Sequence, residues 1–280
     1  MRNIELLPYK GQASPTSINH YQRKIGSLLY AAVITRPDIA FATSRLARFN
    51  INPSPEHQKE ADRALRYLQG TRNLALQYGQ GDAFEVASDA SFADNTIDRK
   101  SSQAYAMKLF GGIIGWRANK QDTVTTSTTE AELLSLAQAA KEGLFVSRLI
   151  KELGVTLDNS RINIKCDNQQ TIRLVNADIA LLNTKLRHVD IHNHWLRQEA
   201  QARRIKVSYT PTDDMIADGL TKTLSSQKHQ RFIQQIGLVD ITQERQERSS
   251  LSADYIDQED YTDDYVQQLK DTLKGGEVKV

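Results

Sequence analysis

Cysteine is almost absent from this chain of 280 residues, in which Cys166 stands alone. An intramolecular disulfide is therefore excluded, and this absence is typical of proteins from a reducing compartment. Long hydrophobic runs are also missing, since the longest, residues 28–34, is far too short to cross a bilayer. The N-terminal residues contain no apolar core of a secretion signal. We therefore expect an intracellular protein with no membrane partner.

A strong net charge is missing as well, because 36 basic residues nearly balance 34 acidic ones. The balance hides an asymmetry, since residues 241–280 contain ten acidic and five basic residues. The preceding part of the chain is correspondingly basic, which suits a polyanionic partner such as nucleic acid. The clustered acids and the low apolar content predict that residues 241–280 form a disordered tail.

Helical periodicity dominates the first part of the chain. Apolar residues recur at helical spacing over residues 18–34, and two further helices are expected at about 38–49 and 55–70. Each of these two follows a turn with a proline suited to a first helical turn. We expect residues 1–17 to be a lead-in without regular structure, and residues 18–80 to form a small helical segment.

From residue 81 onward, strands alternate with helices, which predicts an α/β domain over residues 81–240. The expected strands are 84–88, 103–110, 113–117, 161–166 and 205–209. The expected helices are 127–153, 168–176, 186–203 and a segment after residue 211. The first three strands follow one another closely, which predicts an antiparallel meander.

Four acidic residues stand at positions that simple packing explains poorly. Asp89 follows small residues in a strand, although Asp is depleted in strands and costly to bury unpaired. The others are Glu132 early in a helix, Asp167 just past a strand, and Asp218 in the last expected helix. Carboxylates that approach one another repel, unless a cation binds or their pKa values rise. We predict that the four converge on divalent metal, which can clamp a phosphate and generate a hydroxide.

Several motifs of the chain can be matched to a known family. They are Ser88-Asp89-Ala90-Ser91, Arg99-Lys100-Ser101-Ser102, Gly115-Trp116-Arg117, Ser127-Thr128-Thr129-Glu130-Ala131-Glu132, Cys166-Asp167-Asn168, Arg187-His188-Val189-Asp190 and Ala217-Asp218-Gly219-Leu220-Thr221-Lys222. In them the chain resembles the ribonuclease H domain of copia-type retrotransposon Pol polyproteins. Residues 18–80, with Thr35-Arg36-Pro37-Asp38-Ile39, resemble the connection segment that precedes this domain.

The resemblance implies a ribonuclease H-like fold, with a mixed sheet of three antiparallel strands and two more, flanked by helices. It also implies hydrolysis of the RNA strand of RNA–DNA hybrids with two Mg²⁺ ions, for which Mn²⁺ can substitute. Asp89, Glu132, Asp167 and Asp218 fall at the family's metal-ligand and catalytic positions. The chain would be the C-terminal part of a reverse transcriptase polyprotein, with the polymerase part as a partner. Its location would be the cytoplasm, in a virus-like particle, or the nucleus.

Two of these positions have rivals close by in the sequence. Glu130 is the third position of a capping box and therefore already has a structural role. Glu132, followed by Leu133-Leu134, resembles the ligand glutamate of related ribonucleases H, so we assign Glu132 to the metal. Asp213 and Asp214 are explained as acids of a first helical turn, so we assign Asp218.

Substrate contacts are expected from two kinds of side chain. Ser101, Ser102 and Asn168 are candidates to bind phosphates or 2′-hydroxyls, the group that distinguishes RNA from DNA. Arg117 and Arg187 are candidates for contacts to the sugar–phosphate backbone. The alternative roles are turn polarity for the first three and a solvated surface for the two arginines. An alternative for the whole chain is a catalytically silent remnant that binds nucleic acid without cleaving it.

Overall fold

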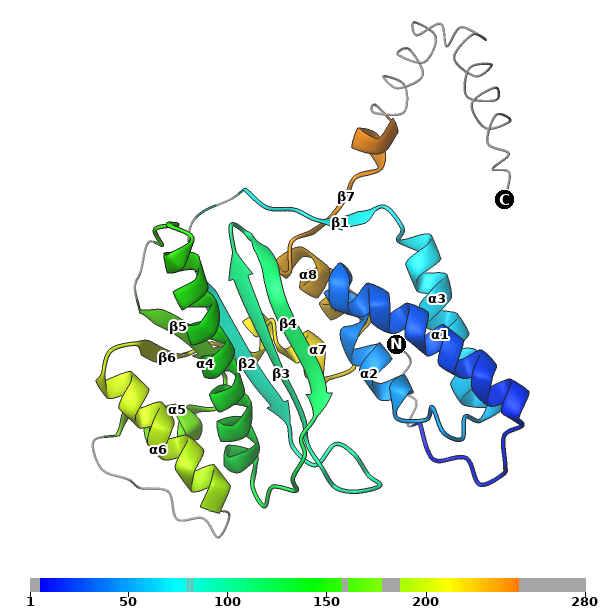
Figure 1. Cartoon of the computed structure of the whole chain (residues 1–280), viewed down its shortest axis with the longest axis horizontal. Helices are drawn as coiled ribbons and strands as arrows, with labels where there is room; N and C mark the ends of the chain where they lie inside the picture. The colour runs from blue at the N-terminus through cyan, green and yellow to red at the C-terminus, as the bar shows by residue number, and fades with distance from the viewer. Residues whose placement is uncertain (1–5, 80, 82, 158–160, 178–186, 247–280) are drawn as a thin grey trace, which may run out of the picture. The chain divides into compact units, whose positions relative to one another are not determined.

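The computed structural model describes residues 6–79, 81, 83–157, 161–177 and 187–246 (Figure 1). The chain divides into two compact units, Met1–Val239 and Asp240–Val280, and the account below concerns the first. Most of the predicted acidic tail, from residue 247 on, lies outside the described residues. Within the described ranges, no helix combines the length and apolarity needed to cross a membrane. The predicted domain boundaries stay a prediction.

The N-terminal part is helical, as predicted. Its elements are α1 (Pro15–Ile34), η1 (Pro37–Ile39), α2 (Ala40–Ala47) and α3 (Pro55–Gly70). Ser14 and Ser54 cap α1 and α3, and in each case a proline occupies the first helical turn. The single helix predicted for residues 38–49 is wrong in its extent. The structure has two elements there, the 3-10 turn η1 and the shorter helix α2.

A mixed five-stranded sheet forms the centre of the rest of the unit. Its strands are β2 (Glu85–Ser91), β3 (Ser102–Leu109), β4 (Gly112–Lys120), β5 (Ile162–Cys166) and β6 (Ile205–Tyr209), in the order β4-β3-β2-β5-β6. The pairs β2–β3 and β3–β4 are antiparallel, whereas β2–β5 and β5–β6 are parallel. This confirms the predicted meander and the mixed sheet expected of a ribonuclease H-like fold. Two further short strands, β1 (Leu74–Leu76) and β7 (Leu238–Asp240), pair with each other.

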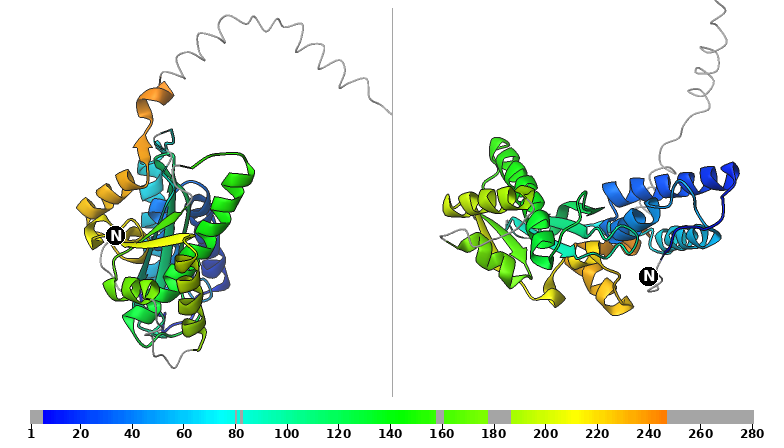
Figure 2. Two further views of the ribbon diagram at one scale, coloured as in Figure 1. Left: turned by 90° about the vertical axis from the view of Figure 1, so that its left-hand side faces the viewer. Right: turned by 90° about the horizontal axis from the view of Figure 1, so that it is seen from below.

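Helices cover both faces of the sheet (Figure 2). One face packs on α4 (Thr128–Glu152), which contacts α5 (Gln169–Asn176) and α6 (Arg187–Gln201). The other face carries the second core, to which α1–α3, α7 (Asp218–Thr221) and α8 (Ser226–Gln235) contribute. Strand alternation separates the two cores: Met107 faces α4, whereas Ala104 and Ala106 belong to the second core. The helical segment therefore packs directly on the sheet.

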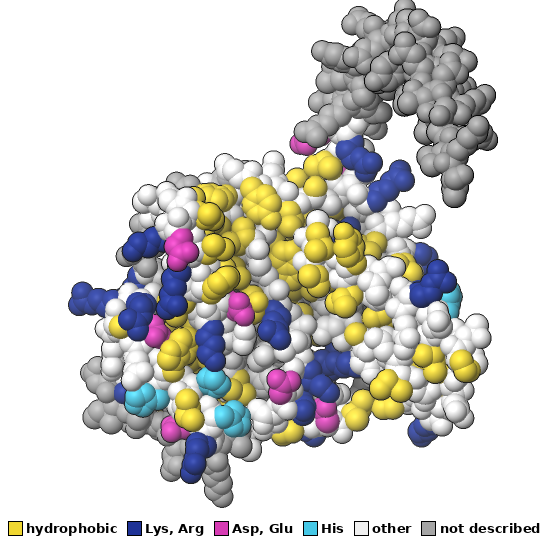
Figure 3. All heavy atoms as spheres, viewed as in Figure 1, with side chains coloured by type: hydrophobic (Ala, Val, Ile, Leu, Met, Phe, Trp, Pro, Cys, Tyr) yellow, Lys and Arg dark blue, Asp and Glu magenta, His cyan; other side chains and the backbone are white. Residues whose placement is uncertain are grey.

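Part of the longest apolar run of the sequence faces outward. Within residues 28–34, Leu28 and Ala32 are buried, while Tyr30 and Val33 are exposed. Figure 3 shows hydrophobic side chains gathered on this side of the molecule, over α1 and α4. The exposed large hydrophobic residues of these helices are Leu29, Tyr30, Val33, Ile34, Phe145, Leu149 and Leu153. Apolar surface of this kind often marks a contact with another protein or domain.

A buried ion pair connects η1 to α3. The Arg36 guanidinium donates to both carboxylate oxygens of Asp38, at 2.9 and 2.7 Å, and the Asp38 side chain is fully buried. The Tyr67 hydroxyl of α3 also donates to Asp38, at 2.7 Å. Arg36 in turn donates to the Thr71 carbonyl and hydroxyl oxygens. Because a buried charge is tolerated only when it is paired, this network fixes the turn that carries α2.

Removal of the carboxylate should therefore be costly. Asp38→Ala leaves the Arg36 cation buried beside an apolar side chain, and we expect it to lower the free energy of unfolding by about 3–5 kcal/mol. Tyr67→Phe removes one hydrogen bond and should cost only about 1–2 kcal/mol. Urea denaturation of the two variants and the wild type measures both values. Equal costs for the two variants would contradict this role of Asp38.

Candidate metal centre

Asp89 is the central residue of the candidate site. It lies near the end of β2, in the middle of the sheet, and is fully buried. Its neighbour on β3 is Ala104, whose small side chain leaves room on that face. The Thr221 hydroxyl donates to Asp89 Oδ2, and Lys222 Nζ lies 3.3 Å from Asp89 Oδ1. The carboxylate is thus held from one side by α7 and the residue that follows it.

Glu132 reaches the same region from the second turn of α4. Its Oε1 accepts a hydrogen bond from the Ala90 amide of β2 at 3.3 Å. Its Oε2 is buried and has no hydrogen-bond partner among the described residues. Glu130 has a separate structural role, because its carboxylate accepts hydrogen bonds from the Thr126 amide and hydroxyl at 2.7 and 2.8 Å. The assignment of Glu132 over Glu130 as a metal ligand stays a prediction.

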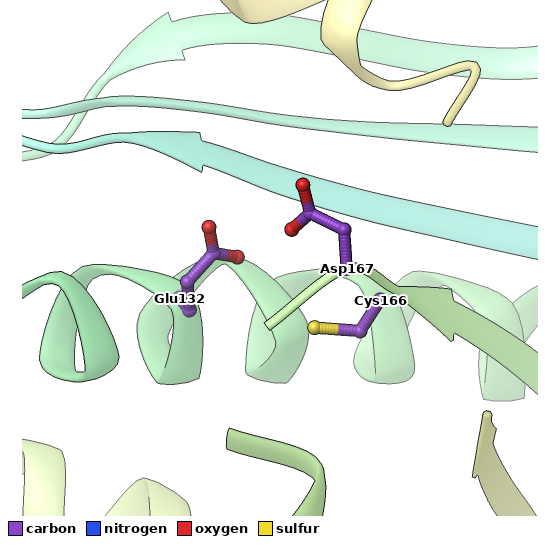
Figure 4. Close-up of side chains that lie close together, drawn as sticks. All are labelled: Glu132, Cys166 and Asp167. Atoms are coloured by element: carbon purple, nitrogen blue, oxygen red, sulfur yellow. The ribbon is translucent and has the colours of Figure 1, made fainter. Parts of the chain in front are cut away.

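Asp167 links the acidic residues into one cluster. It directly follows β5, which is parallel to β2, and this pairing brings its side chain near Asp89. One oxygen each of Asp89, Asp167 and Asp218 lie within 4.8 Å of one another. The same holds for ligand atoms of Glu132, Cys166 and Asp167, and Figure 4 shows these three side chains together. Asp167 also accepts a hydrogen bond from the Thr212 hydroxyl at 2.8 Å.

Asp218 completes the cluster from the start of α7. Its Oδ1 lies 2.7 Å from Lys222 Nζ, so Lys222 bridges Asp218 and Asp89. The next residue, Gly219, allows α8 to pack closely, because a Cβ atom there would lie 2.6 Å from the Phe232 ring. The predicted helix after residue 211 is interrupted, with the 3-10 turn η2 (Thr212–Asp214) preceding α7. The rivals Asp213 and Asp214 are exposed and pair with Lys228 and Arg231.

Burial and mutual repulsion perturb the acidity of these groups. Burial raises the pKa of the Asp89 carboxyl to about 6, and Asp218 and Asp167 add to this, while Lys222 opposes it. Burial, with Asp89 and Asp167 nearby, also raises the pKa of Glu132 well above its usual value. The pKa of Asp218 is raised by burial. Burial alone would lower the pKa of Lys222, but Asp89 and Asp218 raise it, so the ammonium stays charged.

The residues present fit a divalent ion. All four acidic side chains offer carboxylate oxygens, the hard ligands that Mg²⁺ and Mn²⁺ prefer. The Oε2 atom of Glu132 is a buried acceptor without a partner among the described residues, and an ion would satisfy it. Cys166 lies beside Glu132 and Asp167, but burial raises the pKa of its thiol, which stays protonated. A bound ion would also reduce the mutual repulsion that adds to the effect of burial on these carboxyl pKa values.

The five predicted substrate residues lie in different surroundings. The Ser101 and Ser102 hydroxyls are buried and bond within the protein, to the Ala93 amide and to Asp94 respectively. Asn168 caps α5 by accepting from the Thr171 amide. Arg117 pairs with Tyr105, which belongs to the α4 core, so it lies on the sheet face opposite Asp89. Arg187 is exposed at the start of α6. Substrate contact by these five residues stays a prediction.

Lys222 and Thr221 are part of the site, and sequence reasoning did not assign them a role. One local signal was available for Lys222. It stands four residues after Asp218, the spacing at which an acid and a base form an ion pair on a helix. No such signal exists for the contact with Asp89, which is 133 residues away in the sequence.

The raised pKa of Asp89 gives a testable dependence of stability on pH. Because the folded protein binds this proton more tightly than the unfolded chain does, metal-free stability should fall as the pH rises from about 4 to 7. Asp89→Asn removes this loss. In EDTA at pH 7.5 we expect it to raise the thermal midpoint by about 5 °C, with a smaller gain at pH 4.5. A gain that does not change with pH, or a loss at pH 7.5, would contradict the electrostatic origin.

No family model matches the chain, but curated relatives do. It is 35% identical over 219 residues to the retrovirus-related Pol polyprotein from transposon TNT 1-94 of Nicotiana tabacum, covering 78% of this chain and 16% of the polyprotein. It is 35% identical over 225 residues to that from transposon RE1 of Arabidopsis thaliana, covering 80% and 15%. The chain thus spans about one sixth of the length of these relatives. Over 129 residues it is 36% identical to secreted RxLR effector protein 161 of Plasmopara viticola, covering 45% and 91%.

Solved structures with a related arrangement include LC11-RNase H1, at 11% identity and a TM-score of 0.39, covering 50% of this chain and 92% of that one. Another is the foamy viral protease-reverse transcriptase in complex with RNA/DNA hybrid, at 14% identity and a TM-score of 0.41. The match covers 78% of this chain and 28% of that one. These TM-scores are low, and the assignment of the fold rests on the strand order of the sheet. By its sequence similarity over most of its length, the chain belongs to the family of retrovirus-related Pol polyproteins of copia-type transposons, and its sheet has the strand order of the ribonuclease H-like fold.

Proposed function

We propose that the chain hydrolyses the RNA strand of RNA–DNA hybrids in a reaction that depends on divalent metal. The observation that carries this proposal is the meeting of four carboxylates from four separate elements, with Asp167 common to both groups of neighbouring ligand atoms. The sequence similarity also supports this proposal, because the chain's relatives are retrovirus-related Pol polyproteins of transposons. We propose Mg²⁺ as the ion, in two positions, with Mn²⁺ as a substitute.

The roles of the chain's own residues follow from their contacts. Two ions bound here would neutralise charge on the phosphate and lower the pKa of an attacking water. Asp89 and Asp167, at the ends of adjacent parallel strands, would bind the ions at the centre of the site. Glu132 would contribute from α4 and Asp218 from α7. Because these elements pack on both faces of a buried sheet, the carboxylates are positioned before substrate binds, as catalysis requires.

The proposal extends to partners and location. The chain without its last 40 residues is basic, which supports a nucleic acid partner. The exposed hydrophobic side chains of α1 and α4 support contact with another part of the same polyprotein, for which we propose the polymerase. We propose the cytoplasm, in a virus-like particle, or the nucleus as the place of action.

The cleavage reaction can be tested on the purified chain with a labelled RNA–DNA hybrid in Mg²⁺. Asp167→Asn and Glu132→Gln each remove a ligand charge, and we expect either to lower the cleavage rate by at least about 10³-fold while circular dichroism stays unchanged. Omission of Mg²⁺ should abolish cleavage in the wild type. Full cleavage by Asp167→Asn would end the assignment.

Matched control variants come from the two rival positions. Asp213→Asn removes an exposed acid that pairs with Lys228, and it should cleave at the wild-type rate. Glu130→Gln weakens the start of α4 and should lower the thermal midpoint while cleavage remains. A gel shift in Ca²⁺ completes the set. Binding without cleavage by the wild type would favour the silent nucleic acid-binding remnant instead.

A further inference from the structure

A pocket apart from the metal centre lies between the helical segment and the sheet. It has a volume of about 300 Å³ and is formed by the end of α2, the lead-in to α1, the loop after β2 and the end of β4. Its polar lining residues are Arg48, Asn52, Asn95, Asp98 and Lys120. None of the four acidic residues of the metal centre lines this pocket. It is therefore a distinct feature that the metal centre does not explain.

The pocket contains a cation without a carboxylate of its own. Within the described ranges, the only hydrogen bond of the Arg48 guanidinium is to the Ser102 hydroxyl, at 3.2 Å. The nearby acids are already engaged, because Asp94 pairs with Arg45 at 2.7 Å and Asp98 pairs with Lys120 at 2.5 Å. Three cations thus stand against two carboxylates in this region.

The pocket lies on the same side of the sheet as the metal centre. Asp89 and Ala104 are direct partners in the β2–β3 ladder, and such partners point to the same face. Ser102 is two residues from Ala104, so its side chain points to that face as well, about 7 Å farther along the strand. Lys120 is the direct partner of Ser102 on β4 and shares the face. Arg48 extends this row from α2.

We infer that Arg48, together with Lys120, binds a backbone phosphate of the nucleic acid duplex held at the metal centre. This inference rests on the proposed function. A nucleic acid strand carries one phosphate per about 3.4 Å of helix axis, so the step of about 7 Å along β3 from Ala104 to Ser102 corresponds to about two phosphates. The helical segment would then be part of the substrate-binding surface, alongside its packing on the sheet.

The chemistry of Arg48 suits this ligand. A guanidinium can bind a phosphate with two parallel hydrogen bonds, and only one of its donors is used by Ser102. Burial and the neighbouring Arg45 lower the pKa of Arg48, whereas Asp94 and Asp98 raise it, and an arginine keeps its charge at neutral pH. A half-buried cation of this kind is best stabilised by an anion, and the pocket provides the space for one.

A purely structural role is the alternative for Arg48. The Ser102 hydroxyl donates to Asp94 while it accepts from Arg48, so Arg48 also helps to hold the loop after β2. Loss of that role alone would lower the thermal midpoint of the protein. It would not change the number of counterions released when nucleic acid binds, and this number distinguishes the two roles.

The test measures binding of a fluorescent RNA–DNA hybrid by anisotropy in Ca²⁺, at several salt concentrations. Arg48→Gln keeps the polar side chain and removes the charge. We expect it to weaken binding about three- to tenfold and to reduce the slope of log affinity against log salt by about 0.9, the value for one lost phosphate contact on a duplex. Arg66→Gln on α3, an exposed arginine outside the pocket, is the matched control and should change neither quantity.

Each outcome decides the matter. An unchanged salt slope for Arg48→Gln, with wild-type binding intact, would overturn this inference and leave the proposed function standing. A lower thermal midpoint without a change in slope would assign Arg48 to the structural role. Absence of hybrid binding by the wild type would overturn both proposals. Equal losses of salt slope for Arg48→Gln and Arg66→Gln would show a diffuse charge effect and would overturn the phosphate contact of Arg48.

Discussion

Repulsion among four clustered carboxylates, of which Asp89 and Glu132 are buried, is the constraint that shapes this molecule. Asp89 and Glu132 are buried, and neighbouring carboxylates add to the rise in pKa that burial causes in Asp89, Glu132 and Asp218. The protein compensates locally, with the Thr221 hydroxyl on Asp89 and the Lys222 ammonium between Asp89 and Asp218. One oxygen of Glu132 remains without a partner. The compensation is therefore incomplete, which is the condition under which a divalent cation binds favourably.

The fold provides the rigidity that such a cluster needs. Strand β2 lies in the centre of the sheet, and its parallel partner β5 places Asp167 next to Asp89. The Ser135 hydroxyl of α4 donates to the carbonyl oxygens of Asp89 and Ala104, and so fixes α4 against both strands. Gly219 permits the close packing of α8 that holds α7 in place. The helical segment closes the same face of the sheet, and it brings Arg45 and Arg48 to the loop after β2.

Local sequence patterns were a good guide to the elements and a poorer guide to their ends. The capping box before α4 and the strand alternation of β3 are local signals, and the structure has these elements where they predict them. Helix α1 begins at Pro15, so residues 15–17 belong to this helix and not to the predicted irregular lead-in. The sequence predicts one helix after residue 211, whereas the structure has the 3-10 turn η2, a turn and the short helix α7 there. Helix α8 and the pair β1–β7 were not predicted. Short elements depend on packing against distant residues, and the pattern of a few side chains does not determine them.

The sequence by itself determined which carboxylates are candidates for the site, because an Asp in a strand of small residues is unusual and the motifs around the other three acids resemble those of a known family. It also determined the mixed character of the sheet through the family that its motifs resemble. Only the tertiary structure decided what surrounds these carboxylates. The strand register placed Arg117 on the face opposite Asp89 and Ser102 on the same face. The packing of the elements places Lys222 next to Asp89, 133 residues away in the sequence, and it places Arg48, just after α2, next to Ser102. Contacts across such separations depend on how whole elements pack, and no local pattern of residues encodes them.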